Sequence, residues 1–318
     1  DLARAADRFG YARYWLAEHH NLPSVASAAP DILIGQIAAV TSRIRVGSGG
    51  IMLPNHAPLM VAERFKTLEA LFPGRIDLGL GRAPGTDGVT ALALRRRQEA
   101  RAGDDFLERL QELILWETDG FPEGHPFRTV AAMPYDAPLP PVWLLGSSGY
   151  SAELSASIGV GFAFAHHFAS YDGAAAMRSY RAGFRPSAWR ETPYAILAVA
   201  VVCAETEHEA ERLASTIDLN WLRRRTGDYR PLASPDEAAA HHYTPADRAH
   251  IARDRERLFV GTPAVVRERL GALIEATACD EVMITSAIYD QEARKRSYGL
   301  LAEAYGLTPA HAIPAAAE

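Results

Sequence analysis

Hydrophobic and polar positions follow two alternating patterns along this chain. Short apolar runs rich in β-branched residues are each followed by longer amphipathic stretches of helical period, with turn residues between them. Strands that alternate with helices in this way are typical of a parallel α/β fold. Strands are predicted at residues 11–18, 44–53, 75–81, 141–146, 161–165, 194–204 and 281–286. Helices are predicted at residues 30–41, 59–71, 89–116, 150–158, 171–184, 206–225, 262–275 and 291–305.

The number of strands favours a (β/α)8 barrel. The chain opens with residues 1–10, which have the pattern of a helix closed by Gly10, with no strand before them. We therefore expect the protein to begin earlier and its first strand to be missing from this sequence. That strand and the seven predicted ones make eight, the number that closes such a barrel. No internal linker stands out, so residues 1–318 are predicted to form one domain. A doubly wound open sheet is the alternative fold.

Two segments interrupt the alternation of strands and helices. Residues 120–140 are rich in proline, phenylalanine and turn residues, and they are interpreted as an insertion near the rim of the barrel. Residues 226–257 are polar, with proline, histidine and charged side chains. A long irregular segment inside a compact domain is often a lid, so this segment is predicted to close over the site.

Composition narrows the range of partners. Hydrophobic residues make up 48% of the 318 residues, charged residues make up 23%, and the formal net charge is −6. This acidic balance, with scattered lysines and arginines, gives no electrostatic basis for binding nucleic acid or a membrane surface. The cysteines Cys203 and Cys279 lie far apart in apolar runs, which fits a reducing cytoplasm. No apolar run reaches the roughly 18 residues that a spanning helix needs.

Candidate chemistry is expected where the predicted strands end, because barrels of this type carry their sites at the C-terminal ends of the strands. The first such end contains His19 and His20. Only one of two adjacent histidines can face the barrel mouth, where it could act as a general base or hydrogen-bond donor. Two loop histidines bonded to backbone are the simpler alternative. A metal site is disfavoured, because no carboxylate or cysteine cluster has ligand spacing.

Glycines mark the next two strand ends. Gly49 and Gly50 lie inside an apolar run, where they indicate either a packing bulge or the close approach of a flat ligand to the backbone. Gly81 precedes Arg82, whose guanidinium could grip a phosphate or form a structural ion pair. The glycines here do not have the spacing of a dinucleotide-binding loop, because Pro84 interrupts them and the third glycine comes one residue late.

Two later strand ends also carry polar groups. A glycine- and serine-rich segment, residues 146–151, leads from a predicted strand into a predicted helix. Backbone N–H groups and hydroxyls at a helix N-terminus can form a phosphate cradle, although an ordinary serine N-cap accounts for the same residues. His166 and His167 follow the next strand, and either could line the cavity.

Taken together, these strand ends resemble those of the bacterial luciferase-like monooxygenase superfamily, in particular its small FMN-dependent subgroup. The motifs that carry the likeness are Trp15–His20, Val46–Pro54, Pro73–Asp87, Leu145–Ser148 with Ser151, and Phe259–Pro263. They follow the family's order and span nearly the whole chain. The resemblance implies a (β/α)8 barrel and supports the expectation of a missing first strand.

The resemblance also implies a role for each strand end. Gly49 and Gly50 would form the family's non-prolyl cis peptide under the flavin ring. Gly81 would lie near the reactive C4a side of the flavin, and Arg82 would reach its phosphate or ribityl chain. His19 matches the histidine that acts in the luciferase active site. The residues of the phosphate loop would be Gly146, Ser147, Ser148 and Ser151.

We therefore hypothesise a two-component monooxygenase that oxygenates a small organic substrate. Because no nicotinamide-dinucleotide fingerprint is visible, reduced FMN is expected to come from a separate NAD(P)H:flavin reductase. Oxygen would add at flavin C4a to give a (hydro)peroxide, with His19 managing a proton. A homodimer is also expected from the resemblance. The alternatives are an F420-dependent dehydrogenase on the same barrel and a non-catalytic FMN-binding protein.

Overall fold

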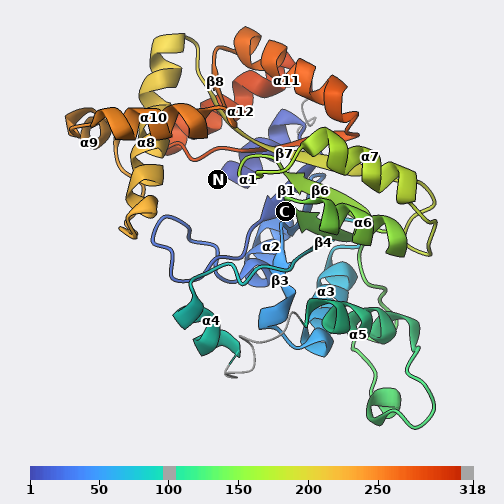
Figure 1. Cartoon of the computed structure of the whole chain (residues 1–318). Coiled ribbons are helices and arrows are strands. Elements are labelled where there is room, and N and C mark those ends of the chain that lie inside the picture. The colour runs from blue at the N-terminus through green and yellow to red at the C-terminus, as the bar shows by residue number, and fades with distance from the viewer. Residues whose placement is uncertain (96–104, 309–318) are drawn as a thin grey trace, which may run out of the picture.

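Parallel strands curl into a nearly closed barrel surrounded by helices in the computed structural model, which describes residues 1–95 and 105–308 (Figure 1). The strand order is β1-β2-β4-β5-β6-β7-β8, with β3 paired to β4 and β9 paired to β7. Every pairing is parallel, which confirms the predicted (β/α) architecture. No strand pairing joins β1 to β9 within the described ranges, so the barrel has a seam there. The ion pair between Arg13 and Glu281, 2.9 Å long, crosses that seam.

The element bounds agree with most of the sequence-based predictions. The strands are β1 (Arg13–Leu16), β2 (Arg45–Ser48), β3 (Ile51–Met52), β4 (Ile76–Gly81), β5 (Val142–Gly146), β6 (Gly161–Ala165), β7 (Ala195–Cys203), β8 (Leu258–Gly261) and β9 (Glu281–Thr285). The helices up to the middle of the chain are α1 (Leu2–Phe9), α2 (Pro30–Ala39), α3 (Pro58–Leu71), α4 (Gly88–Arg95), α5 (Phe106–Thr118), α6 (Gly149–Ile158) and α7 (Gly173–Gly183). The later helices are α8 (Glu207–Arg225), α9 (Pro235–Ala240), α10 (Pro245–Arg255), α11 (Pro263–Thr277) and α12 (Gln291–Ala304). Two 3-10 helices, η1 (Leu53–Asn55) and η3 (Pro126–Thr129), complete the set. The predicted helix 89–116 includes residues 96–104, which lie outside the described residues.

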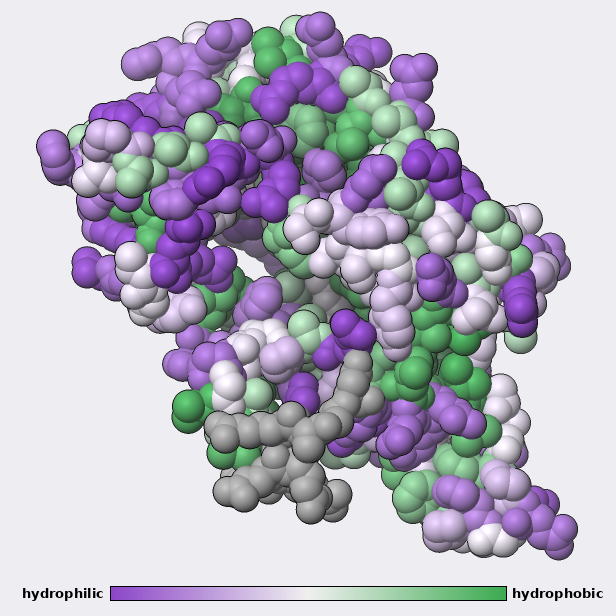
Figure 2. Space-filling model, viewed as in Figure 1, coloured by the Kyte–Doolittle hydropathy of each residue, from purple (hydrophilic) through white to green (hydrophobic). Residues whose placement is uncertain are grey.

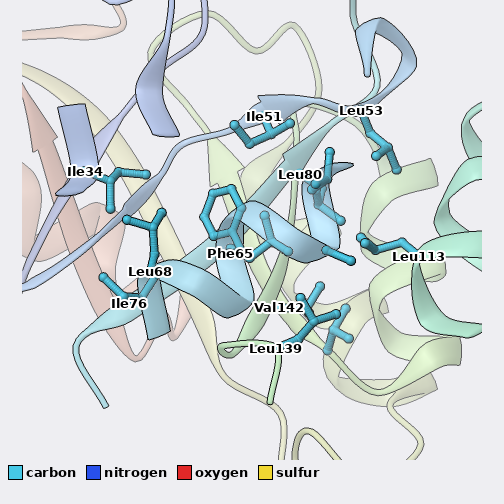
Figure 3. Packing of buried hydrophobic residues seen from close by; sticks show 14 of the residues in the cluster. Ile34, Ile51, Leu53, Phe65, Leu68, Ile76, Leu80, Leu113, Leu139 and Val142 are labelled. Carbon is cyan, nitrogen blue, oxygen red and sulfur yellow. The ribbon is translucent and has the colours of Figure 1, made fainter. Parts of the chain in front are cut away.

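Strand residues alternate between the helix layer and the barrel interior, as the twofold period of a strand requires. On β4, Ile76 and Leu80 point outward and pack with Phe65 of α3 and Leu113 of α5 in one buried cluster (Figure 3). The residues in the interior form a separate small cluster, which includes Trp143 of β5. The helices therefore bury the outer face of the barrel, while the interior remains available for polar groups and for a site.

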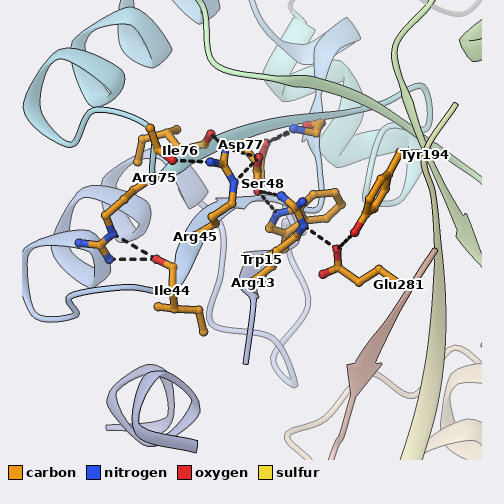
Figure 4. Close-up of polar contacts among 12 residues, drawn as sticks. Arg13, Trp15, Ile44, Arg45, Ser48, Arg75, Ile76, Asp77, Tyr194 and Glu281 are labelled. Carbon is orange, nitrogen blue, oxygen red and sulfur yellow. Dashed lines mark hydrogen bonds and ion pairs between the residues drawn. The ribbon is translucent and has the colours of Figure 1, made fainter. Parts of the chain in front are cut away.

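Charged side chains fill the floor of the barrel, at the N-terminal ends of the strands (Figure 4). Asp77 is fully buried and accepts hydrogen bonds from Arg13 at 2.7 Å and from Arg45 at 2.7 Å. The indole of Trp15 donates to the same carboxylate at 3.1 Å. Arg13 also binds Glu281, so the network joins both edges of the seam. Because barrel sites lie at the opposite end, we assign this network to stability.

Close contact between neighbouring strands depends on glycine at one interior position of β4. A Cβ at Gly79 would lie 2.1 Å from the carbonyl oxygen of Ser48, which is backbone and cannot move aside. We expect Gly79→Ala to lower the free energy of unfolding by about 1–3 kcal/mol, because extra atoms in a packed region force the backbone apart. Urea unfolding measures this change.

A matched glycine-to-alanine substitution on a helix should raise the free energy of unfolding instead of lowering it. Gly271 lies within α11, and a Cβ there meets nothing within 4 Å. Gly271→Ala should therefore stabilise the protein by about 0.5–1 kcal/mol, since glycine is a poor helix former. If Gly79→Ala proved as stable as Gly271→Ala, the close approach of β2 and β4 would be contradicted.

The prediction that residues 226–257 are irregular is wrong, because this segment contains the helices α9 and α10. Ser234 and Thr244 are their N-caps, and each accepts a hydrogen bond from the backbone N–H three residues later, at 3.1 and 3.2 Å. Proline occupies the first turn of both helices. The capping residues are visible in the sequence, but no apolar period follows them, and α10 has no buried residue. Hydrophobic patterning therefore missed these helices.

Two further differences concern strands and the insertion. The four-residue strand β8 was not predicted, because it is shorter than the apolar runs that mark the other strands. The predicted strand 44–53 is two strands, β2 and β3. The insertion at 120–140 follows α5, which returns the chain to the N-terminal ends of the strands before β5. It therefore lies at the rim opposite the mouth and projects at the lower right of Figure 1.

Candidate active site

Loops that follow β1 and β4 meet at the C-terminal end of the barrel. Figure 2 shows the surface hollowed between α4 and the helices α8 and α10, on the side to which these loops run. Several hydrogen bonds hold the two loops together. The backbone N–H of His20 donates to the carbonyl of Gly85 at 3.3 Å, and Thr86 donates its hydroxyl hydrogen to the carbonyl of His20 at 2.9 Å. Asn21 donates to Asp87 at 3.1 Å.

His19 is held at this junction by two backbone groups. Its ring nitrogen Nδ1 lies 3.1 Å from the carbonyl oxygen of Gly85, and its own N–H donates to the carbonyl of Ser27 at 3.0 Å. A carbonyl only accepts, so the contact with Gly85 assigns the proton to Nδ1. The other ring nitrogen, Nε2, is then an acceptor. His19 therefore has the arrangement of a group that can receive a proton at Nε2.

The neighbouring Glu18 was missed as a functional candidate. It is fully buried, and its carboxylate accepts hydrogen bonds from the backbone N–H of Met52 at 2.8 Å, from Nε2 of His20 at 2.9 Å and from Nε2 of His56 at 3.0 Å. Burial alone would raise the pKa of Glu18, but the hydrogen bonds from His56, His20 and Met52 outweigh it and hold that pKa below its usual range. The only sequence signal was a glutamate directly after an apolar strand.

The glycines between β2 and β3 allow close backbone packing. The Gly49–Gly50 peptide is cis, as the resemblance to the luciferase-like superfamily implies. A Cβ at Gly50 would lie 2.7 Å from the carbonyl oxygen of Gly79, and a Cβ at Gly49 would lie 3.1 Å from the side chain of Trp15. Contacts within the protein thus account for glycine at both positions, in agreement with the packing alternative.

Arg82 lies beside the beginning of α6. Its guanidinium stacks on the ring of Tyr150, 4.5 Å from the ring centroid. Gly81, which precedes it, is covered by the side chain of Met52: a Cβ at Gly81 would lie 2.9 Å from the sulfur. The structure therefore brings the end of β4 and the serine-rich segment after β5 together.

The segment after β5 presents hydroxyl groups at a helix N-terminus. Ser148 is the N-cap of α6, yet its side chain forms no cap hydrogen bond. Within the described part of the chain, the hydroxyls of Ser147 and Ser151 also donate to no protein group. A Cβ at Gly146 would lie 2.1 Å from Oγ of Ser151, so that hydroxyl lies directly against the strand end. The ordinary N-cap alternative therefore does not describe this segment.

A family model described as luciferase-like monooxygenase matches residues 1–280. The chain belongs to the luciferase-like monooxygenase family. A luciferase-like monooxygenase of Escherichia coli strain K12 is 43% identical over 300 residues, which cover 94% of this chain and 88% of the relative. N-acetyl-S-alkylcysteine monooxygenase of Bacillus subtilis strain 168 is 33% identical over 305 residues, which cover 95% of this chain and 90% of the relative.

Solved structures agree with this assignment. The crystal structure of apo-MsnO8 superposes with a TM-score of 0.87 at 44% identity, covering 97% of this chain and 92% of that one. Two distant structures show the likeness of fold alone. One is the oxygenating constituent of 3,6-diketocamphane monooxygenase of Pseudomonas putida in complex with FMN (TM-score 0.67, 20% identity, 95% and 89% covered). The other is an F420-dependent secondary alcohol dehydrogenase (TM-score 0.66, 12% identity, 96% and 93% covered).

In residues 1–95 and 105–308, no three or more His, Cys, Asp or Glu side chains are grouped so that they could hold a metal ion. The same ranges contain no helix with the length and apolar character to cross a membrane.

His166 and His167 follow β6, and the surroundings of both rings favour the neutral form. Nδ1 of His167 lies 3.2 Å from the carbonyl oxygen of Ala198, the β7 residue paired with the last residue of β6. Burial lowers the pKa of His167, and the nearby His166 adds to this effect. Burial lowers the pKa of His166 as well, followed by the charge of Arg257.

The lowered pKa of His167 predicts a loss of stability in mild acid. As the pH falls below about 6.5, the unfolded imidazole binds a proton before the native one does, so the free energy of unfolding falls until the native pKa is passed. Urea unfolding at pH 7.5 and pH 5.5 measures the loss. His167→Gln should lose less stability over this interval than the unchanged protein. His208 is exposed on α8, so His208→Gln should lose as much stability between pH 7.5 and pH 5.5 as the unchanged protein does. Equal losses in all three proteins would refute the effect.

Proposed function

We propose that this family member is a monooxygenase that uses externally supplied reduced FMN and O2 to oxygenate a small organic substrate. One observation carries the proposal: beside an arginine, the segment after β5 offers a helix N-terminus that Ser148 does not cap and serine hydroxyls that donate to no group within residues 1–95 and 105–308. Helix N-termini bind phosphate through their backbone N–H groups and the helix dipole. A phosphate group suits these residues, because the serine hydroxyls can donate hydrogen bonds to it and the arginine carries positive charge.

The residues present fit a flavin mononucleotide phosphate. Ser147 and Ser148 would hold it at the N-terminus of α6, where Ser148 makes no cap of its own. Ser151 would approach it from the first turn of the helix. Arg82 stacks on Tyr150 of this turn, so its charge lies next to the same place. When bound, the reduced flavin supplies the electrons that activate O2.

His19 would manage a proton at the reaction centre. With its proton on Nδ1 and directed to the carbonyl of Gly85, the ring keeps Nε2 as an acceptor. A positioned imidazole of this kind can take a proton from a reacting group and return it. The hydrogen bonds between the loops after β1 and β4 would keep the ring at a fixed position during this exchange.

The rest of the proposal concerns partners and access. The chain has no nicotinamide-dinucleotide fingerprint, which supports a separate NAD(P)H:flavin reductase as the source of reduced FMN. We further propose a cytoplasmic homodimer. The segment 226–257, with α9 and α10, would close over the mouth, and its end already touches the loop after β6 through the bond from Arg257 to the carbonyl of Ala169 at 3.1 Å.

Anaerobic titration with reduced FMN, oxidised FMN, F420 and NADH tests the proposal. We expect reduced FMN to bind far more tightly than NADH, and O2 to be consumed with product formation only when a flavin reductase is present. Failure to bind either redox state of FMN would end the proposal. Tight binding of F420 in its place would favour a dehydrogenase. FMN binding without any oxygen-dependent product from substrate extracts would favour a non-catalytic flavin-binding protein.

Arg82→Ala tests the phosphate cradle separately. Loss of a charged hydrogen-bond donor to a phosphate costs about 1.5–3 kcal/mol, so the Kd for reduced FMN should rise by about 10- to 100-fold. Arg212→Ala is the matched control, because Arg212 is an exposed arginine on α8 that pairs with Glu209. It should bind reduced FMN as the unchanged protein does. Equal affinities in the two variants would remove Arg82 from the cradle.

A further inference from the structure

The buried carboxylate of Glu18 accepts hydrogen bonds from four residues. Besides Met52, His20 and His56, it accepts from the side-chain amide of Asn55 at 3.3 Å. These partners belong to two parts of the chain: the loop after β1, which contains His20, and the continuous segment 52–56 that runs from β3 through the 3-10 helix η1. One carboxylate therefore ties the His19 segment to the backbone that runs beside it.

Both carboxylate oxygens must accept hydrogen bonds at once. Oε2 accepts from the backbone N–H of Met52 at 2.8 Å, and Oε1 accepts from His20 at 2.9 Å. Nε2 of His56 lies 3.0 Å from each oxygen. The backbone N–H of Met52 faces Oε2, and the side-chain NH2 of Asn55, whose orientation Arg95 fixes, faces Oε1. Neither group can turn into an acceptor, so a carboxylate fits this position and a neutral amide does not. The pKa of Glu18, held below its usual range, agrees with an ionised group.

The same network reaches the carbonyl that holds the His19 ring. Asn55, which donates to Glu18, also donates to the carbonyl of Pro84 at 3.0 Å. The next carbonyl along the chain, that of Gly85, is the acceptor for Nδ1 of His19. Arg95 donates to the side-chain oxygen of Asn55 at 3.0 Å and so fixes which way the amide faces. Glu18 is thus connected to His19 through the chain on one side and through Asn55 and the β4 loop on the other.

We infer that Glu18 is a positioning residue. Its carboxylate fixes the backbone at His19 and, through Asn55 and the Pro84 carbonyl, the neighbouring Gly85 carbonyl that sets the tautomer of the His19 ring. The inference rests on the proposed role of His19 as the proton-handling group. Glu18 itself touches no reacting atom. Its contribution is to hold Nε2 of His19 as an acceptor that faces a constant direction, with no rearrangement when a proton arrives.

Glu18→Gln tests this inference, because it keeps the shape and removes the second acceptor oxygen. We expect the turnover rate to fall by about 10- to 100-fold, the range typical of a lost supporting hydrogen bond or a small misplacement of a reacting group. The Kd for reduced FMN should change by less than about threefold. In the flavin-free protein, 15N-histidine spectra should show His19 losing its single Nδ1–H tautomer. Its signals among the 11 histidines are identified by their absence in His19→Gln.

Asp7→Asn is the matched control for a general loss of stability. Asp7 is also a buried carboxylate, and it accepts from the backbone N–H groups of Ser42, Arg43 and Ile44 at 2.8, 3.2 and 2.9 Å. These partners precede β2, at the end of the barrel opposite to His19. Asp7→Asn should be destabilised to a similar degree while its turnover rate and its His19 signals stay unchanged.

The outcomes separate this inference from the proposed function. An unchanged His19 tautomer in Glu18→Gln would overturn the inference, as would an equal loss of turnover in Asp7→Asn. If Glu18→Gln did not fold, Asn55→Ser would decide in its place, because it breaks the link to Pro84 and leaves the carboxylate intact. The tautomer spectra need no flavin, so they remain decisive even if reduced FMN did not bind and the proposed function failed.

Discussion

Replacing His19 by alanine is expected to lower the rate of coupled oxygenation by about 10²- to 10⁴-fold, the usual contribution of a positioned acid–base group. The ring is fixed through Nδ1 to the carbonyl of Gly85 at 3.1 Å, which leaves Nε2 to take the proton. Oxygen consumption and product yield, followed together with reduced FMN and a reductase, measure the loss. The affinity for reduced FMN should stay nearly constant, because the phosphate cradle lies after β5 and not beside His19.

A second substitution at the same position separates placement from proton transfer. Asn can donate a hydrogen bond to Gly85 as Nδ1 does, but it offers no titratable nitrogen in place of Nε2. His19→Asn should therefore be as slow as His19→Ala, and His208→Ala, at an exposed position on α8, should retain full turnover. Full coupled turnover in either variant at position 19 would remove the histidine from the mechanism and leave the proposed flavin site untouched.

Replacing Asp77 by alanine is expected to lower the free energy of unfolding by about 3–5 kcal/mol, the usual cost of removing one partner from a buried ion pair. Asp77 is fully buried and neutralises both Arg13 and Arg45, whose side chains are only 12% and 25% exposed. Burial disfavours the charge of Arg13, yet Asp77 and Glu281 outweigh burial and raise its pKa. Without Asp77, two guanidinium groups and the indole N–H of Trp15 lose an acceptor at the floor of the barrel.

Urea unfolding of Asp77→Ala beside Asp228→Ala measures this effect. Asp228 also pairs with an arginine, Arg230, at 2.8 Å, but both side chains are solvent-exposed. Exposed ion pairs contribute about 0–1 kcal/mol, so Asp228→Ala should be close to the unchanged protein. A loss below about 1 kcal/mol in Asp77→Ala would mean that Glu281 alone satisfies Arg13 and that the floor network adds little stability.

The fold followed from local patterns wherever an element carried a strong hydrophobic period. The outward residues Ile76, Leu78 and Leu80 of β4 alternate with inward Asp77 and Gly79, and this strand was predicted within one residue of its bounds. The helices α9 and α10 were missed for the opposite reason, because their polar sequence contains caps but almost no buried residues. A buried helix or strand has a periodic hydrophobic pattern in its sequence. An exposed helix has no such pattern, so only its capping residues indicate where it begins.

The candidate site divides in the same way. His19, Arg82 and the serines after β5 were identifiable because each follows a recognisable strand, and the end of a strand is a property of local sequence. Their partners were not identifiable. Glu18 binds residues 34 to 38 positions further along the chain, and His19 binds a carbonyl 66 positions away. Contacts over such separations depend on how loops pack, which no local period encodes.

By itself, the sequence determined the alternation of strands and helices, the family resemblance and the residues placed at the barrel mouth, since these depend on spacing along the chain. Only the tertiary structure decided which groups those residues face. It showed that the hydroxyl of Ser148 does not cap α6 and that packing against Gly79 accounts for the glycine at position 50. It also showed that Glu18, next to His19, accepts hydrogen bonds from Met52, Asn55 and His56. The physical reason is that a hydrogen bond or a close packing contact depends on distance in space, and the parallel barrel brings together strand ends that lie far apart in the sequence.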